Sequence, residues 1–180
     1  MIYLDTSFIA PLVINEKTSD AVEALVIKVK LGELATSMWT QIELASLVAR
    51  KRRMGEFSAR EAESVRREFA HLLDESFQII LPTAIDFAVA TQFLAVPKTG
   101  LRAGDAFHLA IAARHQAKKI YSLDKTFIKV GKQLMSRKTS HVLRLNLQDG
   151  PVDLECTRKM FEGFVVAAVD RAVGRQLYRI

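Results

Sequence analysis

Short apolar or β-rich segments alternate along this chain with longer segments of helical periodicity. The short segments are residues 2–4, 34–36, 77–81 and 120–123. Between and after them the pattern predicts helices at about residues 6–14, 18–31, 39–54, 58–75, 83–95, 104–116 and 125–131. Strands separated by helices pair in parallel and are covered on both faces. The alternation therefore predicts an α/β fold with a central parallel sheet between helices.

The last part of the sequence has a different character. The chain has 180 residues and a net charge of +6, and the basic excess lies mainly after residue 131. Residues 132–180 predict a basic connector, an apolar alternation at 141–147 and a helix over about 156–173. We expect this extension to follow the sheet-forming part, and the sequence assigns it no role.

Composition excludes several classes of protein. With 49% hydrophobic and 26% charged residues, the chain is typical of a globular protein rather than a disordered one. The only cysteine, Cys156, cannot form an intrachain disulfide, and residues 1–5 lack the pattern of a secretory signal. The apolar runs are shorter than the roughly 20 residues of a membrane span. We therefore expect a cytoplasmic protein without a membrane segment.

Two acids come directly after predicted strands. Asp5 follows residues 2–4, and Asp124 follows residues 120–123. Open α/β folds bind ligands at the carboxyl ends of their strands, so both positions suit a functional site. Each acid also has a plain structural explanation, because an Asp between a strand and a helix can cap that helix.

Two further acids lie in apolar helical segments. Glu43 occurs in a turn without a basic residue at helical spacing, and Asp105 opens a segment in which His108 is the only other polar residue before Arg114. An unpaired buried carboxylate is costly, so each acid should face a cleft, a partner or a metal. The alternatives are an exposed residue near a helix start for Glu43 and a helix cap for Asp105.

Together the four acids form a pattern that caps explain poorly. Carboxylate oxygens are the ligands that Mg²⁺ and similar hard ions prefer. Four anions in one cleft would repel a phosphodiester, whereas a bound ion would neutralise them, polarise the phosphate and activate a water. The sequence therefore favours a Mg²⁺ or Mn²⁺ site built from Asp5, Glu43, Asp105 and Asp124.

These motifs resemble a known family. The segments Ile-Tyr-Leu-Asp-Thr-Ser at 2–7, Leu-Arg-Ala-Gly-Asp-Ala-Phe-His-Leu-Ala at 101–110 and Tyr-Ser-Leu-Asp-Lys-Thr-Phe at 121–127, with Glu43 in its apolar helix, are similar to PIN-domain ribonucleases, specifically VapC-type toxins. The resemblance covers about residues 1–131. It implies a three-layer PIN-like domain over 1–131, with a sheet of four to five parallel strands, and leaves 132–180 as a basic C-terminal extension.

The resemblance also implies an activity. Such enzymes are Mg²⁺- or Mn²⁺-dependent endoribonucleases, toxins of type II toxin–antitoxin pairs that leave a 5′-phosphate and a 3′-hydroxyl. It implies that Asp5 and Asp105 are the principal metal ligands and that Glu43 and Asp124 complete the pocket. A homodimer and a cognate antitoxin are the partners that the resemblance implies.

Several other residues have weaker indications. Candidates for substrate binding are Thr6, Ser122, Lys98 and Arg102. The basic run 50–53 could contact RNA phosphates or serve a helix C-terminus. Trp39 could stack on a base or belong to the core, and His108 could act as a general base or be a hydrogen-bonded structural residue.

Two other functions remain open at this stage. A catalytically silent PIN-like module would bind RNA or protein without cutting, and a housekeeping RNA-processing nuclease would cut without being a toxin. A phosphohydrolase of the aspartyl-phosphate type is disfavoured because Ser7 stands where its second acid belongs. Neither of the two glycine-rich nucleotide-binding motifs occurs.

Overall fold

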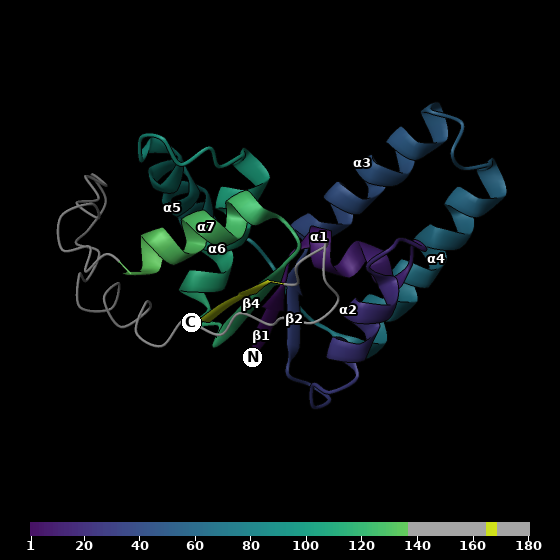
Figure 1. Cartoon of the computed structure of the whole chain (residues 1–180), viewed down its shortest axis with the longest axis horizontal. Coiled ribbons are helices and arrows are strands. Elements are labelled where there is room, and N and C mark those ends of the chain that lie inside the picture. Colours follow the sequence, from purple (N-terminus) through teal and green to yellow (C-terminus); the bar gives the residue numbers. More distant parts are fainter. Residues whose placement is uncertain (137–164, 169–180) are drawn as a thin grey trace.

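A parallel β-sheet forms the centre of the molecule (Figure 1). The computed structural model describes residues 1–136 and 165–168. Its strands are β1 (Ile2–Leu4), β2 (Leu34–Ser37), β3 (Gln78–Ile80), β4 (Lys119–Ser122) and β5 (Val165–Ala168). They lie in the order β3-β2-β1-β4-β5, and every neighbouring pair is parallel. The predicted α/β fold with a parallel sheet is confirmed.

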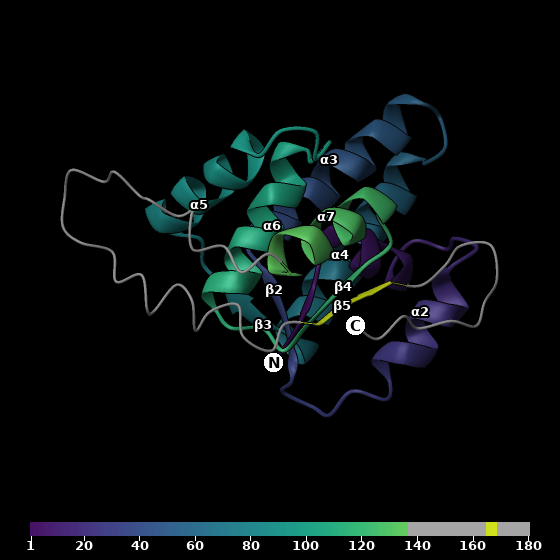
Figure 2. The same ribbon diagram turned by 60° about the vertical axis from the view of Figure 1, so that its left-hand side comes forward.

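Helices cover both faces of this sheet. They are α1 (Thr6–Ile9), the 3-10 helix η1 (Ala10–Leu12), α2 (Ser19–Val26), α3 (Trp39–Arg53), α4 (Ala59–Ser76), α5 (Ala84–Ala95), α6 (Ala103–Arg114) and α7 (Lys125–Ser136). In Figure 1, α2, α3 and α4 lie to one side of the strands, and α5, α6 and α7 lie to the other. The turned view in Figure 2 shows α5, α6 and α7 grouped together. The three layers match the sequence-based expectation.

Two helix starts carry the capping pattern that the sequence predicts. At α4, the Ser58 backbone N–H donates to Glu61 Oε2 (2.7 Å), and the Glu61 N–H donates to Ser58 Oγ (3.2 Å). At α5, the Thr83 N–H donates to Asp86 Oδ2 (2.7 Å). These bonds satisfy N–H groups that have no partner inside the helix. Both acids therefore belong to helix ends and not to the candidate site.

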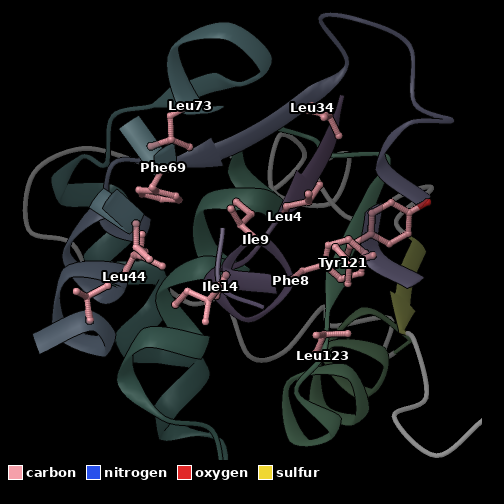
Figure 3. Close-up of a cluster of buried hydrophobic side chains, with 14 of the residues drawn as sticks. Leu4, Phe8, Ile9, Ile14, Leu34, Leu44, Phe69, Leu73, Tyr121 and Leu123 are labelled. Carbon is pink, nitrogen blue, oxygen red and sulfur yellow. The ribbon is translucent and has the colours of Figure 1, made fainter. Parts of the chain in front are cut away.

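Two hydrophobic cores pack against opposite faces of the sheet. Successive side chains of a strand point to opposite faces, so Leu4 enters one core and Tyr3 the other. The core around Leu4 includes Phe8 of α1, Leu44 of α3 and Phe69 of α4 (Figure 3). The core around Tyr3 is formed mainly by α5 and α6. Both residues are fully buried, which fixes the position of the residue that follows β1.

The extension departs from its prediction at one point. Residues 165–168 form strand β5, which pairs with β4 from Lys119↔Val165 to Ser122↔Ala168, so the helix expected over 156–173 is wrong for these residues. The run Val-Val-Ala-Ala is short, apolar and β-branched at its start, which suits a strand in a parallel sheet. The rest of that helix and the alternation at 141–147 lie outside the described residues. The domain boundary at residue 131 stays a prediction. Helix α7 runs past it to Ser136.

Within residues 1–136 and 165–168, no helix combines the length and the apolar character that a bilayer span requires.

Candidate active site

The candidate site lies where the order of the strands in the sheet reverses. The chain places β2 on one side of β1 and β4 on the other, so the carboxyl ends of β1 and β4 meet at a topological switch point. Asp5 follows β1, and its backbone N–H donates to the carbonyl of Tyr121 in β4 (3.1 Å). Asp124 follows β4 by two residues. Ligands of open α/β sheets bind at such a position, and the two strand-end acids share it as predicted.

Asp5 is buried and serves as the cap of α1. Only 4% of its surface is exposed. Its Oδ1 atom accepts hydrogen bonds from Ser7 Oγ (2.8 Å) and from the Phe8 backbone N–H (3.0 Å). Burial raises the pKa of Asp5 to about 6, although His108 and these hydrogen bonds oppose the rise. The carboxylate is thus held in place while its negative charge is poorly compensated.

A chain of hydroxyl groups joins Asp5 to Asp124. Besides donating to Asp5, Ser7 Oγ accepts the Leu123 N–H (2.9 Å) and lies 3.3 Å from Ser122 Oγ. Ser122 Oγ in turn accepts the Asp124 N–H (3.0 Å). Ser122 is fully buried, so its hydroxyl orders the backbone between the two acids. Its proposed role toward the substrate stays a prediction.

Asp124 both caps α7 and faces the other acids. Its Oδ1 atom accepts the N–H groups of Thr126 (2.7 Å) and Phe127 (3.0 Å), as an N-cap does. Its charge also raises the pKa of Asp105. The capping alternative from the sequence is therefore correct for Asp124, and it does not remove the acid from the site.

Asp105 lies half-buried in the first turn of α6. Its Oδ2 atom accepts the Arg102 backbone N–H (3.2 Å), so this acid also caps its helix. Burial raises the pKa of Asp105, and the charges of Asp124 and Glu43 raise it further against the effect of His108. The negative charges of Asp124 and Glu43 therefore disfavour ionisation of Asp105.

Glu43 is held by two side chains from other elements. Its Oε2 atom accepts a hydrogen bond from Thr6 Oγ1 at the start of α1, and it lies 2.7 Å from His108 Nε2 in α6. Burial alone would raise the pKa of Glu43, but the hydrogen bond and charge of His108, together with the Thr6 bond, lower it below its ordinary value. Thr6 thus contacts an acid of the site, and its expected role in substrate binding stays a prediction.

His108 connects this carboxylate to the core. Only 2% of its surface is exposed, and its Nδ1 atom lies 2.7 Å from the Tyr3 hydroxyl. Burial raises the pKa of Tyr3, so the phenol keeps its proton and can donate it to Nδ1. The Nε2–H group is then left to donate to Glu43. These contacts support the interpretation of His108 as a hydrogen-bonded structural residue. Its partner Glu43 is a candidate site residue.

The acidic side chains suit a hard divalent ion held partly through water. Within the described ranges, no three His, Cys, Asp or Glu side chains are close enough to hold one ion directly. Mg²⁺ usually takes one or two carboxylates and keeps several waters. The repulsion at Asp105 and the raised pKa of Asp5 are both conditions that a cation would relieve. The assignment of Asp5 and Asp105 as the principal metal ligands, with Glu43 and Asp124 beside them, stays a prediction.

The basic candidates lie at the surface. Lys98 and Arg102 are exposed in the segment between α5 and α6, and Lys98 adopts a positive φ of 63°. Arg102 immediately precedes α6, the helix that carries Asp105. Both side chains are accessible to a polyanion, and their role in substrate binding stays a prediction.

The other indications resolve as structural contacts. The Trp39 ring packs edge-on against Phe107, with ring centroids 5.4 Å apart, and joins the core around Tyr3. In the basic run at the end of α3, Lys51 pairs with Glu56 (2.8 Å). These contacts favour a core position for Trp39 and a partly structural role for the basic run 50–53.

The contact between His108 and Glu43 was not foreseen from the sequence. Asp105 and His108 are three residues apart, which places them on one face of α6. That spacing could have shown that His108 faces the acids. Glu43 lies 65 positions away in the chain, however, and no local pattern connects the two residues.

Comparison with protein families identifies the fold. The family model described as the PIN domain matches residues 2–133. This chain belongs to the PIN domain family. The match covers both strand-end acids, Glu43 and Asp105, and it confirms the family resemblance. A comparison with curated protein sequences finds no match.

Solved structures of other proteins are similar to this PIN domain. One is the Mycobacterium tuberculosis toxin VapC20, described as cleaving the sarcin–ricin loop, with 23% identity and a TM-score of 0.59 over 73% of this chain and 95% of that one. Another is FitAcB from Neisseria gonorrhoeae, with 20% identity and a TM-score of 0.56 over 73% and 94%. FitAB bound to a DNA fragment gives 23% identity and a TM-score of 0.51 over 73% and 91%. At these identities the likeness establishes the fold.

Proposed function

We propose that this PIN domain is a metal-dependent endoribonuclease and the toxin of a type II toxin–antitoxin pair. The observation that carries the proposal is the meeting of Asp5 and Asp124 at the switch point, with Asp105 close enough to sense the charges of Asp124 and Glu43. Acids whose pKa is raised by burial, as at Asp5, or by neighbouring acids, as at Asp105, are typical of functional sites.

The residues of such a site would have different roles. Asp5 and Asp105 would hold Mg²⁺ or Mn²⁺, and Glu43 and Asp124 would fix its waters and the surrounding charge. When bound, the ion supplies the positive charge that stabilises the phosphate and makes a water acidic enough to attack it. The hydroxyl chain of Ser7 and Ser122 keeps Asp5 and Asp124 oriented. Thr6 and His108 orient Glu43.

RNA is the substrate that the resemblance to PIN-domain ribonucleases supports best. The net charge of +6 favours a polyanionic partner, and Lys98 and Arg102 are exposed beside the start of α6. VapC20, to which the fold is similar, is described as a toxin that cleaves the sarcin–ricin loop. On whichever RNA this chain cuts, cleavage should leave a 5′-phosphate and a 3′-hydroxyl.

The proposed partners follow from the toxin role. We expect an antitoxin to cover the site, and we expect the chain to form a homodimer in the cytoplasm. The FitAcB and FitAB structures lend support to an antitoxin, because their fold matches over most of the described chain. Expression of the chain should stop growth, and co-expression of a small neighbouring gene's product should restore it. Harmless expression of an active nuclease would instead support an RNA-processing role.

The nuclease activity is tested by cleavage of RNA with and without Mn²⁺. We expect the full chain to cut only with the metal and Asp5→Asn and Asp105→Asn to lose most of the activity. Asp74→Asn is the matched control, because Asp74 is an exposed acid on α4. Equal cleavage by all four proteins would contradict the proposed site. Binding of RNA without cleavage by any of them would favour the catalytically silent module.

A further inference from the structure

Gly104 is packed against Glu43 in a way that leaves no room for a side chain. A Cβ atom built on Gly104 would overlap Glu43 Oε1 and would lie 3.5 Å from Glu43 Cδ and 3.5 Å from Trp39 Nε1. The nearest atoms therefore belong to the carboxylate and the indole of α3, outside the helix that carries Gly104. The start of α6 and the start of α3 therefore approach each other closely at Gly104.

We propose that Gly104 is a positioning residue of the acidic site, because its missing side chain is what allows Glu43 to lie against α6. In that place Glu43 Oε2 meets Thr6 Oγ1 and His108 Nε2. The other oxygen, Oε1, occupies the space that a Cβ of residue 104 would take. This inference rests on the proposed function for its effect on cleavage.

Gly104 has no other evident reason to be glycine. Positive φ values, which favour glycine, occur at Gly32, Gly55 and Gly100 but are not found at Gly104. Gly104 is the second residue of α6, where glycine offers no helix-forming advantage over alanine. A glycine that supplies neither a helix-forming advantage nor a special backbone conformation is explained by the close approach of Glu43.

The collision involves a flexible group, which makes the substitution informative. The overlapping atom is the far end of the Glu43 side chain, and that end can move without a shift of either backbone. Gly104→Ala should therefore fold normally and melt no lower than the original protein, since alanine favours the helix. The carboxylate of Glu43 should move away from Thr6 and His108.

The first arm of the test observes the hydrogen bond directly. The ¹H–¹⁵N NMR signal of the His108 ring, assigned by its loss in His108→Gln, reports the contact with Glu43 without any metal or RNA. We expect Gly104→Ala to shift this signal toward its position in Glu43→Ala. Ala103→Gly is the matched control: it exchanges the same two residue types at an exposed position in the same helical turn, and it should leave the signal in place.

The second arm measures cleavage of RNA with Mn²⁺ in a double-mutant cycle. Gly104→Ala should lower the rate roughly a hundredfold, as a small displacement of a catalytic group can. In the Glu43→Ala background the same substitution should leave the residual rate unchanged, because the group that it displaces is absent. An equal loss in both backgrounds would overturn the proposal.

The two arms separate this inference from the proposed function. An unshifted His108 signal in Gly104→Ala would overturn the positioning role, even if the chain proves to be a nuclease. A shifted signal in a protein that cleaves no RNA would uphold the positioning role and reject the nuclease. A large fall in melting temperature would show that Gly104 serves packing and would also contradict the proposal.

Discussion

His108 Nε2 lies 2.7 Å from Glu43 Oε2, a contact that ties α6 to α3 across 65 residues of sequence. The other ring nitrogen of His108 meets Tyr3 of β1, so one imidazole joins the core to the acidic site. The site acid is therefore positioned by groups that themselves never need to touch a substrate.

His108→Phe should weaken both stability and activity. The substitution leaves the buried Tyr3 hydroxyl without its partner, at a cost of about 1–3 kcal/mol in the free energy of unfolding. It also frees Glu43 from a bond that lowers its pKa, so cleavage should fall. Urea denaturation and RNA cleavage measure the two effects. Glutamine retains hydrogen-bonding groups at this position, and an equal loss in His108→Gln and His108→Phe would argue against the role of the bond.

Asp5→Asn should stabilise the protein without metal at neutral pH. Burial raises the pKa of Asp5 from 3.8 to about 6. The folded protein therefore favours the protonated carboxyl, and this stabilising contribution is present below pH 4 and lost as the pH rises through 6. The advantage of Asp5→Asn over the original protein should grow across this window by about 3 kcal/mol.

Denaturation at several pH values, with a chelator present, checks this prediction. The difference in unfolding free energy between the two proteins should rise between pH 4 and 6 and stay level above pH 7. A constant difference at all pH values would show that Asp5 titrates normally.

Much of the site was predictable because its acids sit at positions that local sequence marks. Asp5 and Asp124 follow short apolar strands, and parallel strands bring their carboxyl ends to one edge. Glu43 and Asp105 stand out because apolar helices rarely carry an unpaired acid. In each case the hydrophobic periodicity or the composition of about ten neighbouring residues indicated where the acid lies.

What could not be predicted depends on distant contacts. Thr6 and His108 both contact Glu43 through the tertiary fold. The residues next to them in the sequence do not indicate these contacts. Strand β5 was missed for the same reason, because Val165–Ala168 gains its structure by pairing with β4. A short apolar run fits a helix or a strand equally well until its pairing partner is known. Gly104 likewise has meaning only through Glu43.

Asp124→Asn should lower cleavage less than Asp5→Asn does. Asparagine caps a helix about as well as aspartate, so the bonds to Thr126 and Phe127 can be kept while the charge is removed. Asp124→Ala should lose the cap as well and cost about 1 kcal/mol in stability. Comparing cleavage rates and melting temperatures of the three variants separates the charge from the cap. A larger loss for Asp124→Asn than for Asp5→Asn would reverse our ranking of the acids.

Stability far from the site should depend on the buried pair of Asp86 and Arg114. Arg114 Nε donates to Asp86 Oδ1 (2.6 Å), and Asp86 is fully buried. Asp86→Ala removes the partner of Arg114 and the cap of α5, and because the arginine is partly exposed it should cost about 2–3 kcal/mol. Glu63→Ala removes an exposed pair with Arg66 and should leave stability almost unchanged. Similar costs for the two variants in urea denaturation would contradict this difference.

In the proposed function, Asp5 and Asp105 are the principal ligands of the divalent metal in an acidic nuclease site. Calorimetric titration of Mn²⁺ into the full chain measures this most directly. We predict binding by the original protein and by Asp74→Asn, and at least roughly tenfold weaker binding by Asp5→Asn and by Asp105→Asn, a loss of about 1.4 kcal/mol or more. Equal Mn²⁺ affinity in all four proteins would contradict the account.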